Sequence, residues 1–128
     1  MDEVNPFPRG YHSINPYLVV KDISDFINFL KKVFHAIEVI RHLEDNETYA
    51  EVQVGDSILM IVEPRENAKP LNSILWVYVS DVEDTYQKAL TNGSTSLMKP
   101  TFKYGTDKIA IVKDPFGIQW HIASYKKG

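Results

Sequence analysis

The chain has 128 residues, a length that suits one domain with its own hydrophobic core. Hydrophobic residues make up 44% and charged residues 24%, which is ordinary for a globular protein. The absence of cysteine excludes disulfides, thiolate zinc sites and cysteine nucleophiles. The net charge is −3 and the basic residues are scattered, so we expect no nucleic-acid partner.

The longest apolar runs, such as residues 58–62, are far too short to cross a bilayer. The first residues are acidic and contain proline, and they lack the basic start and apolar stretch of a signal peptide. We therefore expect a cytoplasmic protein with no membrane partner. An irregular N-terminal arm is expected at 1–12, ahead of a single domain at 13–128.

The first predicted strand covers residues 13–21. Leu18 and Val20 fall on one of its faces, and Tyr17 falls on the other. Because Pro16 has no backbone N–H to donate, this strand is predicted either at the edge of a sheet or with a distorted start.

A helix is predicted over 24–34, where apolar residues recur at the i, i+3, i+4, i+7 spacing of one buried stripe. Asp22 or Ser24 can cap its first amides. His35 is expected in the left-handed conformation that often ends a helix. Three strands are predicted next, at 37–43, 48–54 and 57–63.

The same order of elements is predicted again after a polar connection at 64–72. The second series comprises a strand at 73–79, a helix from about 82, and strands at 95–102, 107–113 and 117–125. Ser80 or Asp81 can cap this helix, and Asn92-Gly93 can end it.

A shift of 59 residues lays Val20, Asp22 and Asp25 on Val79, Asp81 and Asp84. Together with the repeated element order, this match favours an internal duplication with units at about 13–64 and 73–125. The alternative is that two capped helices after strands look alike by chance.

Four segments carry a resemblance to a known family, at 16–22, 54–60, 79–83 and 113–120. In that order they resemble the opening strand, the Ile-Gly-Asp-Ser hairpin, the second helix start and the closing Asp-Pro-Phe-Gly-x-x-Trp signature of glyoxalase and bleomycin-resistance proteins. These proteins belong to the vicinal oxygen chelate superfamily, which also includes dioxygenases. The nearest subgroup is the one named after a protein of the phosphonate-utilisation cluster.

The resemblance implies an α+β fold of two βαβββ units. The units would form a curved mixed-sheet cup with the helices on its convex face, and the cup would hold a small molecule. Members of the family are often homodimers, so we expect a homodimer here.

In metal-dependent members, four cup side chains bind one divalent ion that chelates adjacent substrate oxygens. The resemblance carries these positions onto Asn15, Met60, Ile74 (Ser73 if the register slips by one) and His121. His121 is a good ligand, but Asn15 is a weak donor and Met60 a soft thioether. Ile74 cannot coordinate at all. The donor set therefore disfavours an intact metal site and a divalent metal cofactor, although Glu51 and Glu63 on predicted strands are alternative ligands.

Strand alternation predicts the lining of the cup. The expected ligand-binding residues are Asn15, Tyr17, Tyr49, Met60, Ile74, Trp76, Tyr78, Gln119 and His121. Trp120 is expected to pack beneath the helices instead. An aromatic, mostly apolar lining suits a planar or amphipathic small molecule. The alternative is that these aromatic residues fill a core or a dimer interface.

Two functions follow from these observations. The favoured one is a small-molecule binder without a metal. The other is a metal-dependent lyase, isomerase or dioxygenase with a rearranged site, for which His121 and Glu51 are the candidate catalytic residues. His121 suits a general base near neutral pH, but it suits a hydrogen-bonded wall residue equally well. A structural dimer with a vestigial cup is a third option.

Overall fold

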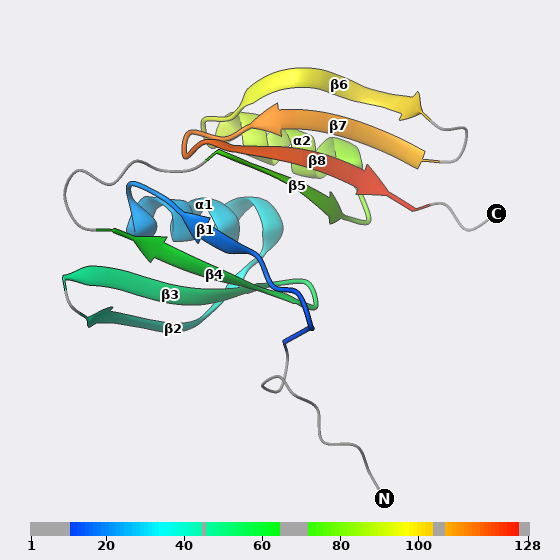
Figure 1. Ribbon diagram of the computed structural model, residues 1–128. Coiled ribbons are helices and arrows are strands. Elements are labelled where there is room, and N and C mark those ends of the chain that lie inside the picture. The colour runs from blue at the N-terminus through cyan, green and yellow to red at the C-terminus, as the bar shows by residue number, and fades with distance from the viewer. Residues whose placement is uncertain (1–10, 45, 65–71, 104–106, 126–128) are drawn as a thin grey trace, which may run out of the picture. The chain divides into compact units, whose positions relative to one another are not determined.

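The computed structural model describes residues 11–44, 46–64, 72–103 and 107–125 (Figure 1). The chain divides into two compact units, Met1–Lys69 and Pro70–Gly128. Residues 1–10 of the predicted arm and 65–71 of the predicted connection lie outside the described ranges. Each unit has its own helix and its own sheet.

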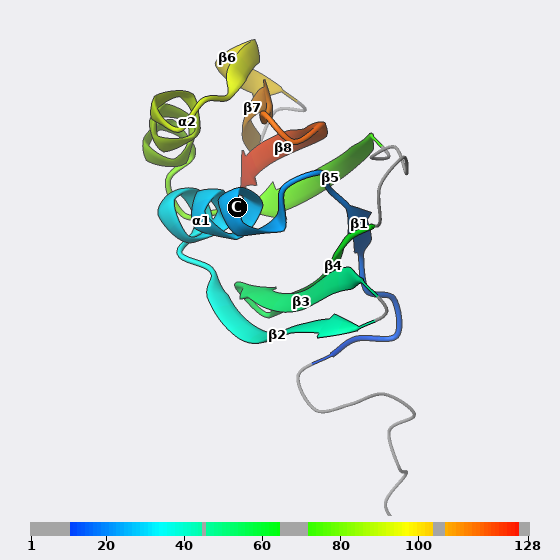
Figure 2. The same cartoon turned by 90° about the vertical axis from the view of Figure 1, so that its left-hand side faces the viewer.

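The first unit contains β1 (Tyr17–Val19), α1 (Ile23–Phe34), β2 (Ile37–Glu44), β3 (Glu47–Val54) and β4 (Ser57–Glu63). Its sheet has the order β1-β4-β3-β2, with β1 parallel to β4 and the other pairs antiparallel. The predicted edge position of β1 is therefore confirmed. Figure 2 shows α1 along one face of this sheet.

The second unit contains β5 (Ser73–Tyr78), α2 (Val82–Thr91), β6 (Thr95–Lys103), β7 (Asp107–Lys113) and β8 (Ile118–Ser124). Its sheet has the order β5-β8-β7-β6, with β5 parallel to β8 and the other pairs antiparallel. Both units are thus βαβββ units with the same strand order, and the predicted α+β fold class is confirmed.

The core of each unit lies between its helix and one face of its sheet. In the first unit the fully buried side chains are Val20, Phe26, Ile27, Leu30, Ala50, Val52 and Ile61. In the second unit Trp120 is 2% exposed and lies on the same face of its strand as the buried Ile122, as predicted. We call the opposite face of each sheet, which carries no helix of its own unit, the open face.

The duplication extends to individual hydrogen bonds. Asp22 accepts a hydrogen bond from the Asp25 amide at 3.1 Å, and Asp81 accepts one from the Asp84 amide at 3.0 Å. These aspartates, rather than Ser24 and Ser80, are therefore the helix N-caps.

Three predicted strands are shorter than expected. β5 ends at Tyr78, one residue before the predicted end. β1 covers three residues rather than 13–21, because Pro16 has no N–H and the residues before it form a turn closed by Asn15. β8 begins at Ile118 because Gly117 has φ +94°, a left-handed conformation that belongs to the preceding turn. His35, with φ +57°, ends α1 as predicted.

The Asp114–Trp120 motif stabilises the turn between β7 and β8. The buried Asp114 carboxylate accepts hydrogen bonds from the Phe116 amide at 2.8 Å, the Ile118 amide at 2.9 Å and the Trp120 indole at 2.7 Å. One side chain therefore holds the β7–β8 turn and fixes the tryptophan beneath α2.

None of the helices in the described ranges is long and apolar enough to cross a membrane.

Candidate functional site

The open face of the second sheet carries an exposed aromatic cluster. Trp76 lies opposite His121 on the neighbouring strand, and their rings stack with centroids 5.8 Å apart at 27°. Tyr78 lies two residues along β5, and its ring meets Trp76 edge-on at 6.0 Å. Trp76 is 45% exposed and Tyr78 61% exposed, so their ring faces are available to another molecule. We call Trp76, Tyr78 and His121 the aromatic platform.

Gln119 positions the His121 ring. The Gln119 Nε2 and His121 Nε2 atoms are 3.0 Å apart, and both residues are half-buried. This contact orients the imidazole, and the histidine tautomer decides which group donates. The contact with Gln119 fits a hydrogen-bonded wall residue, which is one of the two roles that the sequence left open. Ile74, opposite Gln119, extends the same face as an exposed apolar side chain.

The open face of the first sheet combines tyrosines with one carboxylate. Tyr17, Met60 and Glu51 lie opposite one another on β1, β4 and β3. The Tyr49 hydroxyl donates a 2.6 Å hydrogen bond to Glu51 Oε2. Burial raises the pKa of the Tyr49 hydroxyl, and the neighbouring Tyr17 raises it further, so Tyr49 remains a hydrogen-bond donor at neutral pH.

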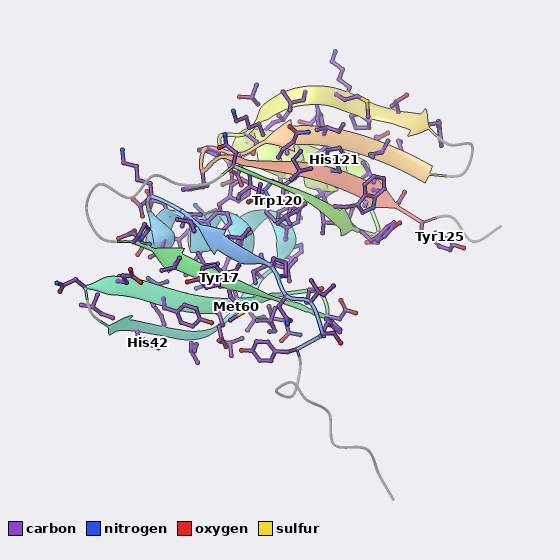
Figure 3. The ribbon with its side chains drawn as sticks, in the orientation of Figure 1. Tyr17, His42, Met60, Trp120, His121 and Tyr125 are labelled. Atoms are coloured by element: carbon purple, nitrogen blue, oxygen red, sulfur yellow. The ribbon has the colours of Figure 1, made fainter. Side chains whose placement is uncertain are left out.

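His42 joins this face, although its orientation could not be predicted. It lies opposite Tyr49 on the adjacent strand, with ring centroids 5.4 Å apart. Figure 3 shows Tyr17, Met60 and His42 on β1, β4 and β2. Neither His42 nor the Tyr49–Glu51 bond was identified from the sequence. The alternation of Tyr49, Glu51 and Gln53 placed the tyrosine and the carboxylate on one face, but it did not reveal that they bind each other.

Two predicted candidates are engaged elsewhere. The Asn15 side chain accepts from the His12 amide at 3.0 Å and donates to the His12 carbonyl at 2.6 Å, so it closes a local turn before β1. Glu63 Oε1 accepts from the Ile23 amide at 2.8 Å, which places the Glu63 carboxylate at the first turn of α1. Glu63 therefore serves the helix rather than an open face.

The four positions that the resemblance assigns to a metal do not form a fitting donor set. Asn15 is occupied by its own turn, Met60 offers a thioether, and Ile74 offers no donor. His121 Nε2 already contacts Gln119. Within the residues that the structure describes, no three histidine, aspartate or glutamate side chains gather where they could hold a metal ion. A hard divalent ion needs at least three strong donors, and this set supplies one.

The predicted site residues thus divide between two open faces. Ile74, Trp76, Tyr78, Gln119 and His121 come together on the second sheet. The first sheet brings together Tyr17, Tyr49, Glu51 and Met60. The two candidate catalytic residues, His121 and Glu51, belong to different units.

Known proteins share this architecture. An uncharacterized protein of Mycobacterium bovis is 25% identical over 123 residues, which cover 86% of this chain and 81% of the relative. The crystal structure of TioX from Micromonospora sp. ML1 has a TM-score of 0.70 at 18% identity and covers 91% of this chain and 98% of its own. A glyoxalase/bleomycin resistance protein/dioxygenase family enzyme from Burkholderia phytofirmans PsJN has a TM-score of 0.72 at 18% identity, covering 91% and 97%. At such identities the two structures establish the fold alone.

A sequence profile identifies the family. The profile of the Glyoxalase/Bleomycin resistance protein/Dioxygenase superfamily matches residues 10–122, which is most of the chain. Both βαβββ units lie within or overlap this match. The chain therefore belongs to the Glyoxalase/Bleomycin resistance protein/Dioxygenase superfamily.

Proposed function

We propose that this protein binds a small aromatic or amphipathic molecule on its open sheet faces, without a metal cofactor. The aromatic platform of Trp76, Tyr78 and His121 carries the proposal. Large aromatic side chains are normally removed from water, yet Trp76 and Tyr78 expose about half of their surface on a sheet face. A planar ligand that stacks on these rings would bury that surface.

The chemistry of the platform favours binding over catalysis. Its only ionisable group besides the Tyr78 hydroxyl is the His121 imidazole, whose Nε2 contacts Gln119. The open face of the first sheet adds tyrosines and Glu51, which are groups that orient a ligand by hydrogen bonding. A lyase, isomerase or dioxygenase with a rearranged metal site is the alternative. That alternative requires strong metal donors besides His121 and Glu51.

A planar fluorescent dye can test the proposal directly. Phenylnaphthylamine, which is neutral and amphipathic, should bind the protein with a rise in its fluorescence. The substitution Trp76→Leu should weaken binding about three- to tenfold, since one aromatic stacking contact contributes about 0.5–1.5 kcal/mol. Dye titration of both proteins gives the two dissociation constants.

Phe102→Leu is the matched control. Phe102 is 74% exposed and lies on β6 of the same sheet, opposite Lys108, whose side chain pairs with Glu83 of α2. It is therefore an exposed aromatic side chain on the helix-covered face. Equal dye affinity in wild type and Trp76→Leu, or an equal loss in Phe102→Leu, would contradict a specific site on the platform.

A further inference from the structure

The Glu51 carboxylate stands in unusual surroundings. Its cross-strand neighbours are Met60 and Ile40, which are both apolar. On its own strand, the Gln53 amide donates to the Gly55 carbonyl at 3.0 Å rather than to Glu51. Within the described ranges, the Tyr49 hydroxyl on Oε2 is its one hydrogen-bond donor, and Oε1 accepts none.

Arg41, on the strand next to that of Glu51, forms its ion pair with Glu38. Arg41 binds Glu38 at 2.8 Å and the Ser24 hydroxyl of α1 at 3.0 Å, so its guanidinium lies on the helix-covered face. Lys31 of α1 also pairs with Glu38, at 3.4 Å. No described ion pair involves Glu51. Among the residues that the structure describes, no cation pairs with Glu51, so its Oε1 is available to a positively charged ligand.

Aromatic side chains lie on the same face of the sheet as Glu51. Tyr49 lies two residues from Glu51 and opposite His42, and Tyr17 lies beyond Met60 in the row that contains Glu51. Tyr17 is 57% exposed, so this face is open to a ligand. The faces of tyrosine rings attract ammonium groups through their quadrupole, and the attraction strengthens when water is excluded.

We infer that the open face of the first sheet recognises an alkylammonium group, with Glu51 as its counter-ion and Tyr17 and Tyr49 as its aromatic walls. The ligand class is then a cationic amphipathic molecule. This inference rests on the proposed binding function of the open faces, because it names the ligand class of one of them. It differs in using the first unit, whereas the aromatic platform belongs to the second.

Choline and its neutral isostere dimethylbutanol separate charge from shape. The two molecules have the same branched end, with nitrogen in one and carbon in the other. Choline should bind wild type at least about fivefold more tightly, as measured by calorimetry or by ligand-observed NMR. Glu51→Gln should lower choline affinity toward that of dimethylbutanol, because the amide keeps an acceptor for Tyr49 but has no charge, while the tyrosine rings retain part of the preference for a cation.

Glu47→Gln is the matched control. Glu47 lies on the same strand at its exposed end, so this substitution removes the same charge about 13 Å from Glu51. It should leave choline affinity within twofold of wild type. Unchanged choline binding in Glu51→Gln, an equal loss in Glu47→Gln, or equal binding of the two probes by wild type would overturn the inference.

Dye binding distinguishes the two proposals. Glu51→Gln should bind phenylnaphthylamine as wild type does, because the neutral dye does not need the carboxylate. If wild type binds choline and dimethylbutanol equally while Trp76→Leu still weakens dye binding, the inference is refuted and the proposal for the platform stands. If Trp76→Leu binds the dye as wild type does while Glu51→Gln still weakens choline binding, only the proposal for the aromatic platform is refuted. Thermal unfolding of each variant verifies that the fold is retained.

Discussion

At the scale of single residues, Asp114 shows how a family signature acts through packing. Its carboxylate accepts from two backbone amides and from the Trp120 indole. Asp114→Asn keeps one oxygen acceptor but turns an NH₂ group toward the indole N–H, or toward the amides. We expect a loss of about 1–3 kcal/mol in the free energy of unfolding, measured by urea denaturation.

Asp56→Asn is the control for Asp114→Asn. Asp56 is exposed in the turn after β3, and within the described part of the chain its side chain accepts from the adjacent Ser57 hydroxyl alone, at 3.2 Å. The same loss of charge should change the free energy of unfolding there by less than about 0.5 kcal/mol. Equal stability of the two variants would show that the Asp114 network contributes little.

Asp114 also predicts a pH dependence of stability. Burial raises the pKa of its carboxyl above the ordinary 3.8, although the hydrogen bonds that it accepts oppose the rise. The folded state therefore holds this proton more tightly than the unfolded chain does. The extra stability that comes from binding this proton is complete below pH 3.8 and is lost as the pH rises through the folded pKa. Asp114→Asn should abolish this contribution, which is visible as a changed slope of unfolding free energy against pH.

At the scale of elements, the two helix starts are equivalent. Ser24 does not cap α1, because its hydroxyl accepts from Arg41 of β2 instead. Asp22→Ala and Asp81→Ala each remove an acceptor for an amide of the first helical turn. Each should cost about 1 kcal/mol of unfolding free energy.

Ser80→Ala is the control for the caps. Ser80 is exposed and precedes the true cap, so its removal should leave the stability of α2 unchanged within about 0.5 kcal/mol. A larger loss in Ser80→Ala than in Asp81→Ala, in thermal or urea unfolding, would contradict the assignment of Asp81 as the cap.

At the scale of the whole molecule, the question is whether the chain carries a metal. We expect protein purified without chelator to hold less than one divalent ion per chain, and its Tm to stay constant when EDTA is added. The reason is the donor set, which consists of one imidazole, one neutral amide, one thioether and one alkyl group. Elemental analysis and thermal unfolding with added nickel, zinc, manganese or iron provide the measurement.

A stoichiometric ion would reverse that conclusion. A metal-induced rise in Tm that disappears in His121→Ala would favour the lyase, isomerase or dioxygenase alternative. The expected homodimer also belongs to this scale and stays a prediction, which light scattering of the purified protein can test.

The sequence by itself determined the order of elements, the buried face of most strands and the duplicated plan. Periodicity suffices for these features, because side chains alternate along a strand and recur every three to four residues on a helix. It placed Trp120 beneath the helices, and Trp76 with Tyr78 on one face of their strand, as the structure has them.

Only the tertiary structure decided which side chains meet across strands. The face of His42 depends on the irregularity in β2 between Glu38 and Ile40, where one extra residue reverses the alternation. The bond from Glu63 to the first amide of α1 and the stacking of Trp76 on His121 likewise join residues at least 40 positions apart. Local periodicity contains no information about such contacts, since they depend on register and on the approach of a helix to a sheet.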